Sequence, residues 1–280
     1  MCVPLAATGW RRVKAGRLSQ EAEHAAALYG GALGQSDKTM FSSKAARGYP
    51  VQTRQAQPGQ KIMTKFVTPE NNKKAMFPVF PVPIYINRLT DDKEFNQELV
   101  SKVETLRNSD PEGVEICKKE YRNGYTSFFS RNQIQKDAEF REIAEQILRH
   151  GRCYARSMGF STENPPLNLI TMFGTINVKG CYHEVHRHRS SLISGTYYVS
   201  ANKTSARISF LDPKAGFRMH EPGGHTGQTI FSNLEFSVQP QTGMIVMFPS
   251  YLEHWVEMQQ NEIPRIGITF NLDLVRDEDC

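Results

Sequence analysis

The sequence predicts a mainly β protein, a barrel or jelly roll with flanking helices, and three observations indicate this class. After Pro165 and Pro166, short segments with apolar residues at every second position follow one another, separated by Gly, Pro and Asn turns. Before them, two segments carry apolar residues at helical spacing. With 280 residues, the chain is long enough to bury a sizeable core in a single domain of this kind.

The first part of the chain, residues 1–75, is rich in Ala, Gly, Ser, Gln, Lys and Arg and has few large apolar residues. Such a segment cannot bury enough surface to offset its chain entropy, so we expect a mostly disordered leader. Its basic, acid-poor composition is typical of an organellar transit peptide and equally of an inert leader. We therefore expect a cytoplasmic protein, or an organellar one if the leader is a transit peptide, with residues 76–280 forming the folded domain.

The elements that precede the strand-rich part can be predicted in order. Between Ala75 and Asn87, apolar residues alternate with prolines, which favours a strand at a sheet edge. Asp91 or Asp92 caps a helix that ends at the Asp110-Pro111-x-Gly113 turn. Loop or short strand follows over 123–130, and a second helix runs over 137–157. The inward positions of these helices are Phe95, Leu99, Val103 and Leu106 in the first, and Phe140, Ile143, Ile147 and Leu148 in the second.

The strands that follow Pro166 are predicted from their period of two and from their bounding turns. The predicted segments are 167–178, 192–199, 206–211, 236–238, 244–248 and 265–272. No Walker loop, GxGxxG or nucleophile-elbow motif interrupts them, which argues against the common nucleotide-binding and hydrolase classes.

Composition excludes several kinds of partner. The formal charge of +5 comes from the leader: residues 1–68 hold ten Lys/Arg and three Asp/Glu, and the rest of the chain holds 24 and 26. We therefore expect no nucleic-acid partner. No apolar run approaches the roughly 20 residues that span a bilayer, so we expect no membrane partner. Five cysteines without a CxxC pair fit a reducing compartment.

The candidate functional residues are histidines, six of the eight lying between His183 and His254. In a strand, His186 and His188 project to the same side, while Arg187 and Arg189 point to the other. His254 follows a strand-like run and a Pro-Ser turn, and it joins them if the sheet folds back on itself. Three convergent imidazoles would form a metal site with open coordination positions.

These residues resemble the 2-oxoglutarate and Fe(II)-dependent oxygenases, and most closely a family named "putative 2OG-Fe(II) oxygenase". The resemblance runs from about Phe77 to Asp273. It implies a double-stranded β-helix fold (jelly roll, cupin-like) that binds Fe(II), 2-oxoglutarate and dioxygen. The expected reaction oxidises a C–H bond of a small molecule by hydroxylation, cyclisation or desaturation, and the expected substrate class is an anionic or amino-acid-derived metabolite. The matching pieces are His186-x-His188, Ser194-Gly195-Thr196-Tyr197-Tyr198-Val199, Ile208-x-Phe210-x-Asp212-Pro213, Gly243-x-x-x-x-Phe248-Pro249-Ser250-x-x-x-His254 and Arg265-Ile-x-Ile-x-Phe270-Asn271.

The metal set implied by the resemblance departs from the common pattern. Where the superfamily has His-x-Asp, this chain has His186-Arg187-His188, so the carry-over gives His186, His188 and His254 as ligands. Asp212 is the competing third ligand, although an Asp before Pro is also a common turn residue. A regular strand would place His183 on the opposite face from His186, where we expect hydrogen bonding rather than ligation.

The resemblance also implies a co-substrate site. An Arg grips a carboxylate with its planar fork, and Arg265, Thr269 and Tyr197 stand where the superfamily holds the far carboxylate of 2-oxoglutarate. Arg189, His220 and His225 are candidate substrate contacts, the two histidines in a Gly-rich loop.

Two alternatives remain open at this level. One is a three-histidine cupin-type dioxygenase that needs no 2-oxoglutarate. The other is a non-catalytic jelly-roll protein whose histidines bind a metal. Arg265 distinguishes the first alternative, because a carboxylate-binding Arg has no purpose without a dicarboxylate.

Overall fold

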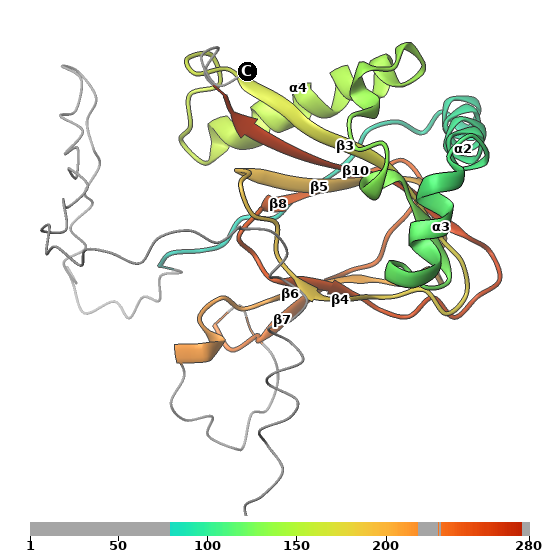
Figure 1. Ribbon diagram of the computed structural model, residues 1–280. Coiled ribbons are helices and arrows are strands. Elements are labelled where there is room, and N and C mark those ends of the chain that lie inside the picture. Colours follow the sequence, from blue (N-terminus) through green and yellow to red (C-terminus); the bar gives the residue numbers. More distant parts are fainter. Residues whose placement is uncertain (1–78, 218–228, 230, 276–280) are drawn as a thin grey trace, which may run out of the picture. The chain divides into compact units, whose positions relative to one another are not determined.

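The computed structural model describes residues 79–217, 229 and 231–275, and strands dominate this part of the chain (Figure 1). Contacts divide the chain after Glu70 into two units, and all the described residues belong to the second, residues 71–280. The predicted leader, 1–75, lies outside the described residues. The predicted fold class, mainly β with flanking helices, is confirmed.

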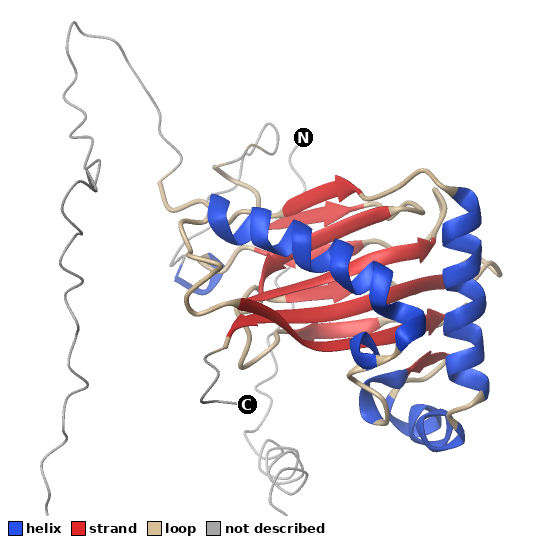
Figure 2. Ribbon diagram, turned by 90° about the horizontal axis from the view of Figure 1, so that it is seen from above, coloured by secondary structure: helices blue, strands red, loops and turns tan. Residues whose placement is uncertain are grey.

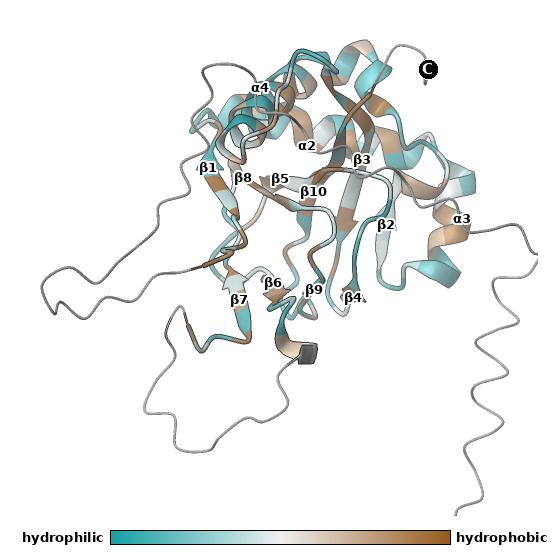
Figure 3. Cartoon of the chain, turned by 90° about the vertical axis from the view of Figure 1, so that its left-hand side faces the viewer, coloured by the Kyte–Doolittle hydropathy of each residue, from teal (hydrophilic) through white to brown (hydrophobic). Residues whose placement is uncertain are grey.

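Two antiparallel sheets face each other, and their strands stand in two rows in the side view (Figure 3). The large sheet has the order β1-β8-β5-β10-β3-β2 and the small sheet the order β4-β9-β6-β7. This is the jelly-roll, double-stranded β-helix arrangement. The strands of the large sheet are β1 (Tyr85–Arg88), β8 (Met244–Pro249), β5 (Ile193–Ser200), β10 (Arg265–Leu274), β3 (Leu167–Asn177) and β2 (Gly124–Thr126). Those of the small sheet are β4 (His183–His186), β9 (His254–Val256), β6 (Ile208–Leu211) and β7 (Glu235–Val238).

Helices α2 (Lys93–Asn108) and α4 (Arg141–Ser157) cross the outer face of the large sheet (Figure 2). The Asp92 side chain accepts hydrogen bonds from two backbone N–H groups of the first turn of α2, as the sequence predicts. The inward residues of both helices are buried in one core with the outward residues of β10, Ile266, Ile268 and Phe270. Both helices therefore act as supports of the sheet. Within the described residues no helix is long and apolar enough to cross a membrane.

A third helix, α3 (Pro111–Glu120), corrects the prediction that the chain only turns at Asp110-Pro111-x-Gly113. Asp110 caps this helix by accepting a hydrogen bond from Gly113 N, and Pro111 occupies the first helical position. Both residues suit a helix start as well as a helix end. Short 3-10 turns lie at Ser127–Phe129, Ile134–Lys136, Ala138–Phe140 and Ala215–Phe217.

The space between the two sheets is lined by both apolar and polar residues. Phe210, Val246, Phe248 and Val256 belong to a second buried apolar cluster. The inner face of β10 is polar, because Arg265, Thr269 and Asn271 alternate with the outward residues that pack under the helices. The fold thus brings β4, β9 and the inner face of β10 to one interior.

Candidate metal and co-substrate site

Three histidines from two distant parts of the sequence meet in this interior. His186 on β4 stands opposite His254 on β9 in the register of the small sheet. His188 follows β4 and is held to the large sheet by its backbone N–H, which donates to Ser250 O at 3.0 Å. The ring centroids are 4.3 Å apart for His186 and His254, 5.2 Å for His188 and His254, and 5.4 Å for His186 and His188.

The three rings are arranged so that their Nε2 atoms remain available. Each Nδ1 has an oxygen acceptor: Glu184 O for His186 at 2.7 Å, Asn271 Oδ1 for His188 at 2.6 Å, and Leu252 O for His254 at 2.9 Å. An acceptor at Nδ1 holds the proton there and leaves the Nε2 lone pair free for a metal. One ring nitrogen of each histidine lies within 4.8 Å of those of the other two.

Burial keeps two of these imidazoles, those of His188 and His254, neutral. His254 is 4% exposed, and burial, with the nearby His186, lowers its pKa to about 3. Burial also lowers the pKa of His188. The ring of Phe248 lies 4.5 Å from that of His254 and shields it on the apolar side. Neutral imidazoles are the form that binds metal.

The lowered pKa of His254 predicts a pH-dependent stability of the metal-free protein. The unfolded chain takes up this proton near pH 6.5, whereas the folded chain does so only near pH 3, so the unfolded state binds more protons in between and stability rises with pH. Between pH 7 and pH 5, this one residue should cost up to about 2 kcal/mol of unfolding free energy. Urea denaturation at both pH values measures the change, and His254→Gln should flatten it. Equal pH dependence in both proteins would contradict the assignment.

The donor set fits an iron ion. Three imidazole nitrogens from one side suit Fe, Zn, Cu or Ni and leave coordination positions for other ligands. Because the set carries no charge, an anionic chelating ligand would compensate the charge of the metal.

His183 lies closer to this group than a regular strand would allow. The register of β4 against β9 shifts between His183 and His186, and this irregularity places the two rings 6.2 Å apart. The prediction of opposite faces is therefore wrong. Its other part, a hydrogen-bonding role, agrees with the structure: His183 Nε2 is bonded to Tyr121 Oη and lies 3.1 Å from Asn177 Nδ2.

The predicted competitor, Asp212, is not part of the metal-binding group found among the described residues. It lies in the turn after β6, where its Oδ1 accepts a hydrogen bond from Lys214 N at 2.9 Å. The turn interpretation of this Asp-Pro pair thus replaces the ligand interpretation. Glu184 is exposed and also lies outside the group.

Arg265 lies inside the protein at the start of β10. It is 6% exposed, and its guanidinium donates to Ala206 O at 3.0 Å and lies 5.8 Å from the centre of the Tyr198 ring. Among the described residues, none of the ion pairs involves it. Burial is the main cause that lowers the pKa of His183, and the charge of Arg265 is the second. Arg265 therefore lies at the His183 side of the interior. A buried cation without a carboxylate partner is costly, so an anionic ligand would stabilise it.

The predicted role of Tyr197 is corrected by the structure. Tyr197 is fully buried on the outer face of β5, where its hydroxyl donates to Asn96 Oδ1 of α2 at 2.6 Å. Its neighbour Tyr198 occupies the inner face beside Arg265. Thr269 does line the interior, with its hydroxyl 3.2 Å from that of Thr196. Tyr198 therefore takes the place predicted for Tyr197.

This difference between neighbouring tyrosines gives a paired prediction. Tyr197→Phe should lower the unfolding free energy by about 1 kcal/mol, because the hydrogen bond to Asn96 is lost, and should leave 2-oxoglutarate affinity unchanged. Tyr198→Phe should weaken 2-oxoglutarate binding several-fold with a smaller effect on stability. Denaturation and calorimetric titration of both variants measure the two effects. Weaker 2-oxoglutarate binding in Tyr197→Phe, with unchanged binding in Tyr198→Phe, would instead support the prediction that Tyr197 contacts 2-oxoglutarate.

The candidate substrate contacts are only partly described. Arg189 is exposed, next to His188. His220 and His225 lie outside the described residues. Sequence reasoning also missed several residues that support the site: Tyr121, Asn177, Ser194 and Asn271. The period of two along β10 places Asn271 on the face of Thr269 and could have identified that residue.

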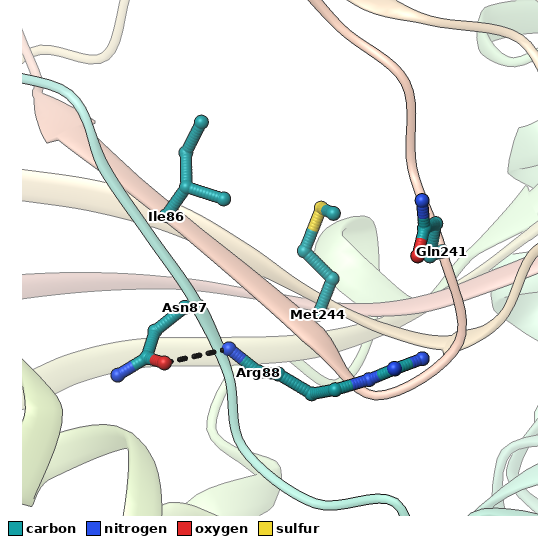
Figure 4. A pocket seen from close by; sticks show the side chains of 5 residues that line it. All are labelled: Ile86, Asn87, Arg88, Gln241 and Met244. Atoms are coloured by element: carbon teal, nitrogen blue, oxygen red, sulfur yellow. Dashed lines mark hydrogen bonds between the residues drawn. The ribbon is translucent and has the colours of Figure 1, made fainter.

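A pocket outside this interior involves none of the candidate residues. It is lined by Ile86, Asn87 and Arg88 of β1 and by Gln241 and Met244 at the start of β8 (Figure 4). His188 of the metal-binding group is hydrogen-bonded to Ser250, just beyond the other end of β8. The pocket is therefore remote from the metal-binding group along the sheet.

Three converging imidazoles and a buried guanidinium between the sheets of a jelly roll form a candidate metal and co-substrate site. Residues 171–271, from β3 to β10, match the model of the family described as "Putative 2OG-Fe(II) oxygenase". The resemblance predicted from the sequence is thereby confirmed. This part of the chain is therefore similar to the 2OG-Fe(II) oxygenases, which are oxidoreductases.

Three solved structures are similar to this chain at low identity. HygX from Streptomyces hygroscopicus, with nickel and 2-oxoglutarate bound, is 12% identical over 69% of this chain and 83% of its own, with a TM-score of 0.45. A prolyl-4-hydroxylase from Pseudomonas putida is 10% identical over 70% and 94%, with a TM-score of 0.46. AviO1 from Streptomyces viridochromogenes Tue57 is 9% identical over 69% and 90%, with a TM-score of 0.48. No curated protein matches the sequence.

Proposed function

We propose that the protein is a 2-oxoglutarate- and Fe(II)-dependent dioxygenase that oxidises a C–H bond of a small-molecule substrate. Hydroxylation is the direct outcome, and oxidative cyclisation or desaturation are related outcomes of the same oxidation. In the hydroxylation, 2-oxoglutarate, dioxygen and the substrate R–H give succinate, CO2 and R–OH, with one oxygen atom of dioxygen in succinate and the other in the product.

The observation that carries this proposal is the buried guanidinium of Arg265 in the same interior as the three histidines. A three-histidine dioxygenase without 2-oxoglutarate has no need of such a cation, and neither has a jelly roll that only binds metal. The planar fork of Arg binds a carboxylate through two parallel hydrogen bonds. Thr196 and Thr269 are only partly buried and lie on the inner faces of the two central strands, so hydroxyls are also available to a polar ligand.

The residues of the site have separable tasks in this reaction. His186, His188 and His254 would hold the iron through Nε2, and the bound iron supplies the oxidising chemistry with dioxygen and 2-oxoglutarate. Arg265, with Thr269 and Tyr198, would orient 2-oxoglutarate by its far carboxylate. Phe210 and Phe248 exclude water behind His254, their rings lying 4.9 Å apart.

The reaction class is tested by measuring succinate from 2-oxoglutarate with Fe(II) and dioxygen, in the presence of a panel of metabolites. We expect Fe(II)-dependent succinate formation that a fitting substrate stimulates. Dioxygen consumption without succinate would favour the three-histidine cupin-type alternative. A non-catalytic jelly roll would be favoured if no dioxygen is consumed and if the His254→Ala variant differs from the wild type only in stability.

For the substrate, we propose an anionic or amino-acid-derived metabolite. Arg187 and Arg189 are exposed on either side of His188 and place positive charge beside the site. The metabolite panel should therefore contain acids together with their neutral amides or esters. A preference for the acids that Arg189→Gln reduces supports this class, and equal rates with both forms would contradict it.

A further inference from the structure

Asn271 on β10 connects the third histidine to the large sheet. Its Oδ1 accepts from His188 Nδ1 at 2.6 Å and from Ser194 Oγ at 2.6 Å. Asn271 is 8% exposed and Ser194 is fully buried. The contacts are therefore protected from water, which strengthens them.

The orientation of the Asn271 amide is set from its other side. Its Nδ2 donates to Thr171 Oγ1 of β3 at 2.7 Å. The Thr171 hydroxyl accepts from the nitrogen end, while His188 Nδ1 and Ser194 Oγ lie at the oxygen end, so this orientation satisfies both ends of the amide. This assignment follows from the hydrogen-bond network, as amide orientations do.

A chain of hydroxyl groups extends the same network. Ser191 Oγ donates to Ser250 Oγ at 2.8 Å, and Ser250 Oγ lies 2.7 Å from Ser194 Oγ. Ser250 also accepts the backbone N–H of His188 through its carbonyl. Both the backbone and the ring of His188 are thus attached to residues of the large sheet, whereas His186 and His254 belong to the small sheet and use backbone carbonyls near them in the sequence.

We propose that Asn271 is a positioning residue that fixes the tautomer and ring orientation of His188, and that it thereby completes a metal site in which no protein carboxylate takes part. This inference rests on the proposed function, since it concerns the same metal site. Partners of this kind, which contact a ligand and not the metal, change metal affinity by about 10- to 100-fold when they are removed.

The test is the affinity for Mn(II) alone, measured by calorimetric titration of the full chain, together with the melting temperature of the metal-free protein. Asn271→Val removes the acceptor and should weaken Mn(II) binding by about 10- to 100-fold. Asn271→Asp keeps an acceptor for His188 and Ser194 and should bind Mn(II) at least as tightly as the wild type, because a carboxylate behind the ring makes the imidazole a stronger ligand.

Thr171→Val tests the same orientation without altering Asn271, so the test does not depend on the folding of Asn271→Val. It should weaken Mn(II) binding several-fold, and Thr171→Ser should restore it. Thr175→Val is the matched control on the same strand, because the Thr175 hydroxyl donates to Gly267 O rather than to this network. The Thr175→Val substitution should change the melting temperature of the protein and leave its Mn(II) affinity unchanged.

The outcomes separate this inference from the proposed function. The positioning role is supported if Mn(II) binding is weaker in Asn271→Val and Thr171→Val. The Mn(II) affinity of Asn271→Asp, Thr171→Ser and Thr175→Val should then be close to that of the wild type. If Asn271→Val and Thr171→Val bind Mn(II) as tightly as the wild type while His254→Ala binds none, the role of Asn271 is overturned and the proposed function is not affected. Equal affinity of wild type and His254→Ala overturns the metal site itself and, with it, this inference.

Discussion

Replacing His254 with alanine is expected to lower the affinity for Mn(II) by at least about 100-fold and to abolish succinate formation. Residues that only orient a ligand already change affinity by about 10- to 100-fold, so the loss of a ligand should exceed that range. His254 has the central position, since its ring is the nearest neighbour of the His186 ring and lies 5.2 Å from that of His188. Calorimetric titration and the succinate assay measure both effects.

A matched control is available outside the site. His150 on α4 is bonded through Nδ1 to Tyr85 Oη at 2.7 Å, on the outer side of the large sheet. His150→Gln should cost about 1 kcal/mol of stability at most and leave Mn(II) binding unchanged. Retained Mn(II) affinity in His254→Ala, or an equal loss in both variants, would show that the three histidines do not form the site.

Replacing Arg265 with methionine is expected to produce the second large effect, on 2-oxoglutarate rather than on the metal. Removing one partner of a buried, hydrogen-bonded charge pair costs about 2–5 kcal/mol, which corresponds to a loss of affinity of roughly 30- to several-thousand-fold. Methionine keeps an unbranched side chain in the space of the Arg stem. The KM for 2-oxoglutarate and its affinity for the Mn(II)-loaded protein measure the loss, and Mn(II) affinity itself should stay near that of the wild type.

Two comparisons make the Arg265 result specific. A 2-oxo acid without the far carboxylate should bind the wild type and Arg265→Met equally well, because the guanidinium has no group to contact in it. Arg207→Met removes a cation that is exposed and paired with Glu257 at 2.6 Å, and it should leave 2-oxoglutarate affinity unchanged. If Arg265→Met weakens both oxo acids alike, the residue supports the fold and does not bind the carboxylate.

Much of the fold was predictable because the sequence signals are local. The apolar positions of α2 and the Asp92 cap follow directly from helical spacing and cap chemistry, and the strands of the large sheet follow from a period of two. The same residues, Asp110 and Pro111, both end α2 and start α3, so the sequence did not distinguish a turn from a second helix.

The site was predictable in its chemistry but not in all its contacts. Period two gives the shared side of His186 and His188, but no local signal marks the register shift that brings His183 near them. β5 is buried on both faces, so alternation along it does not tell which of Tyr197 and Tyr198 faces the interior. The link from His188 to Asn271 joins residues 83 positions apart and depends on sheet register alone.

A crystal structure of the protein with Mn(II) and 2-oxoglutarate, grown without dioxygen, tests the central claim most directly. We predict one ion bound by the Nε2 atoms of His186, His188 and His254, with the far carboxylate of 2-oxoglutarate on the guanidinium of Arg265. An ion bound through Asp212, or a co-substrate whose carboxylate lies away from Arg265, would contradict it.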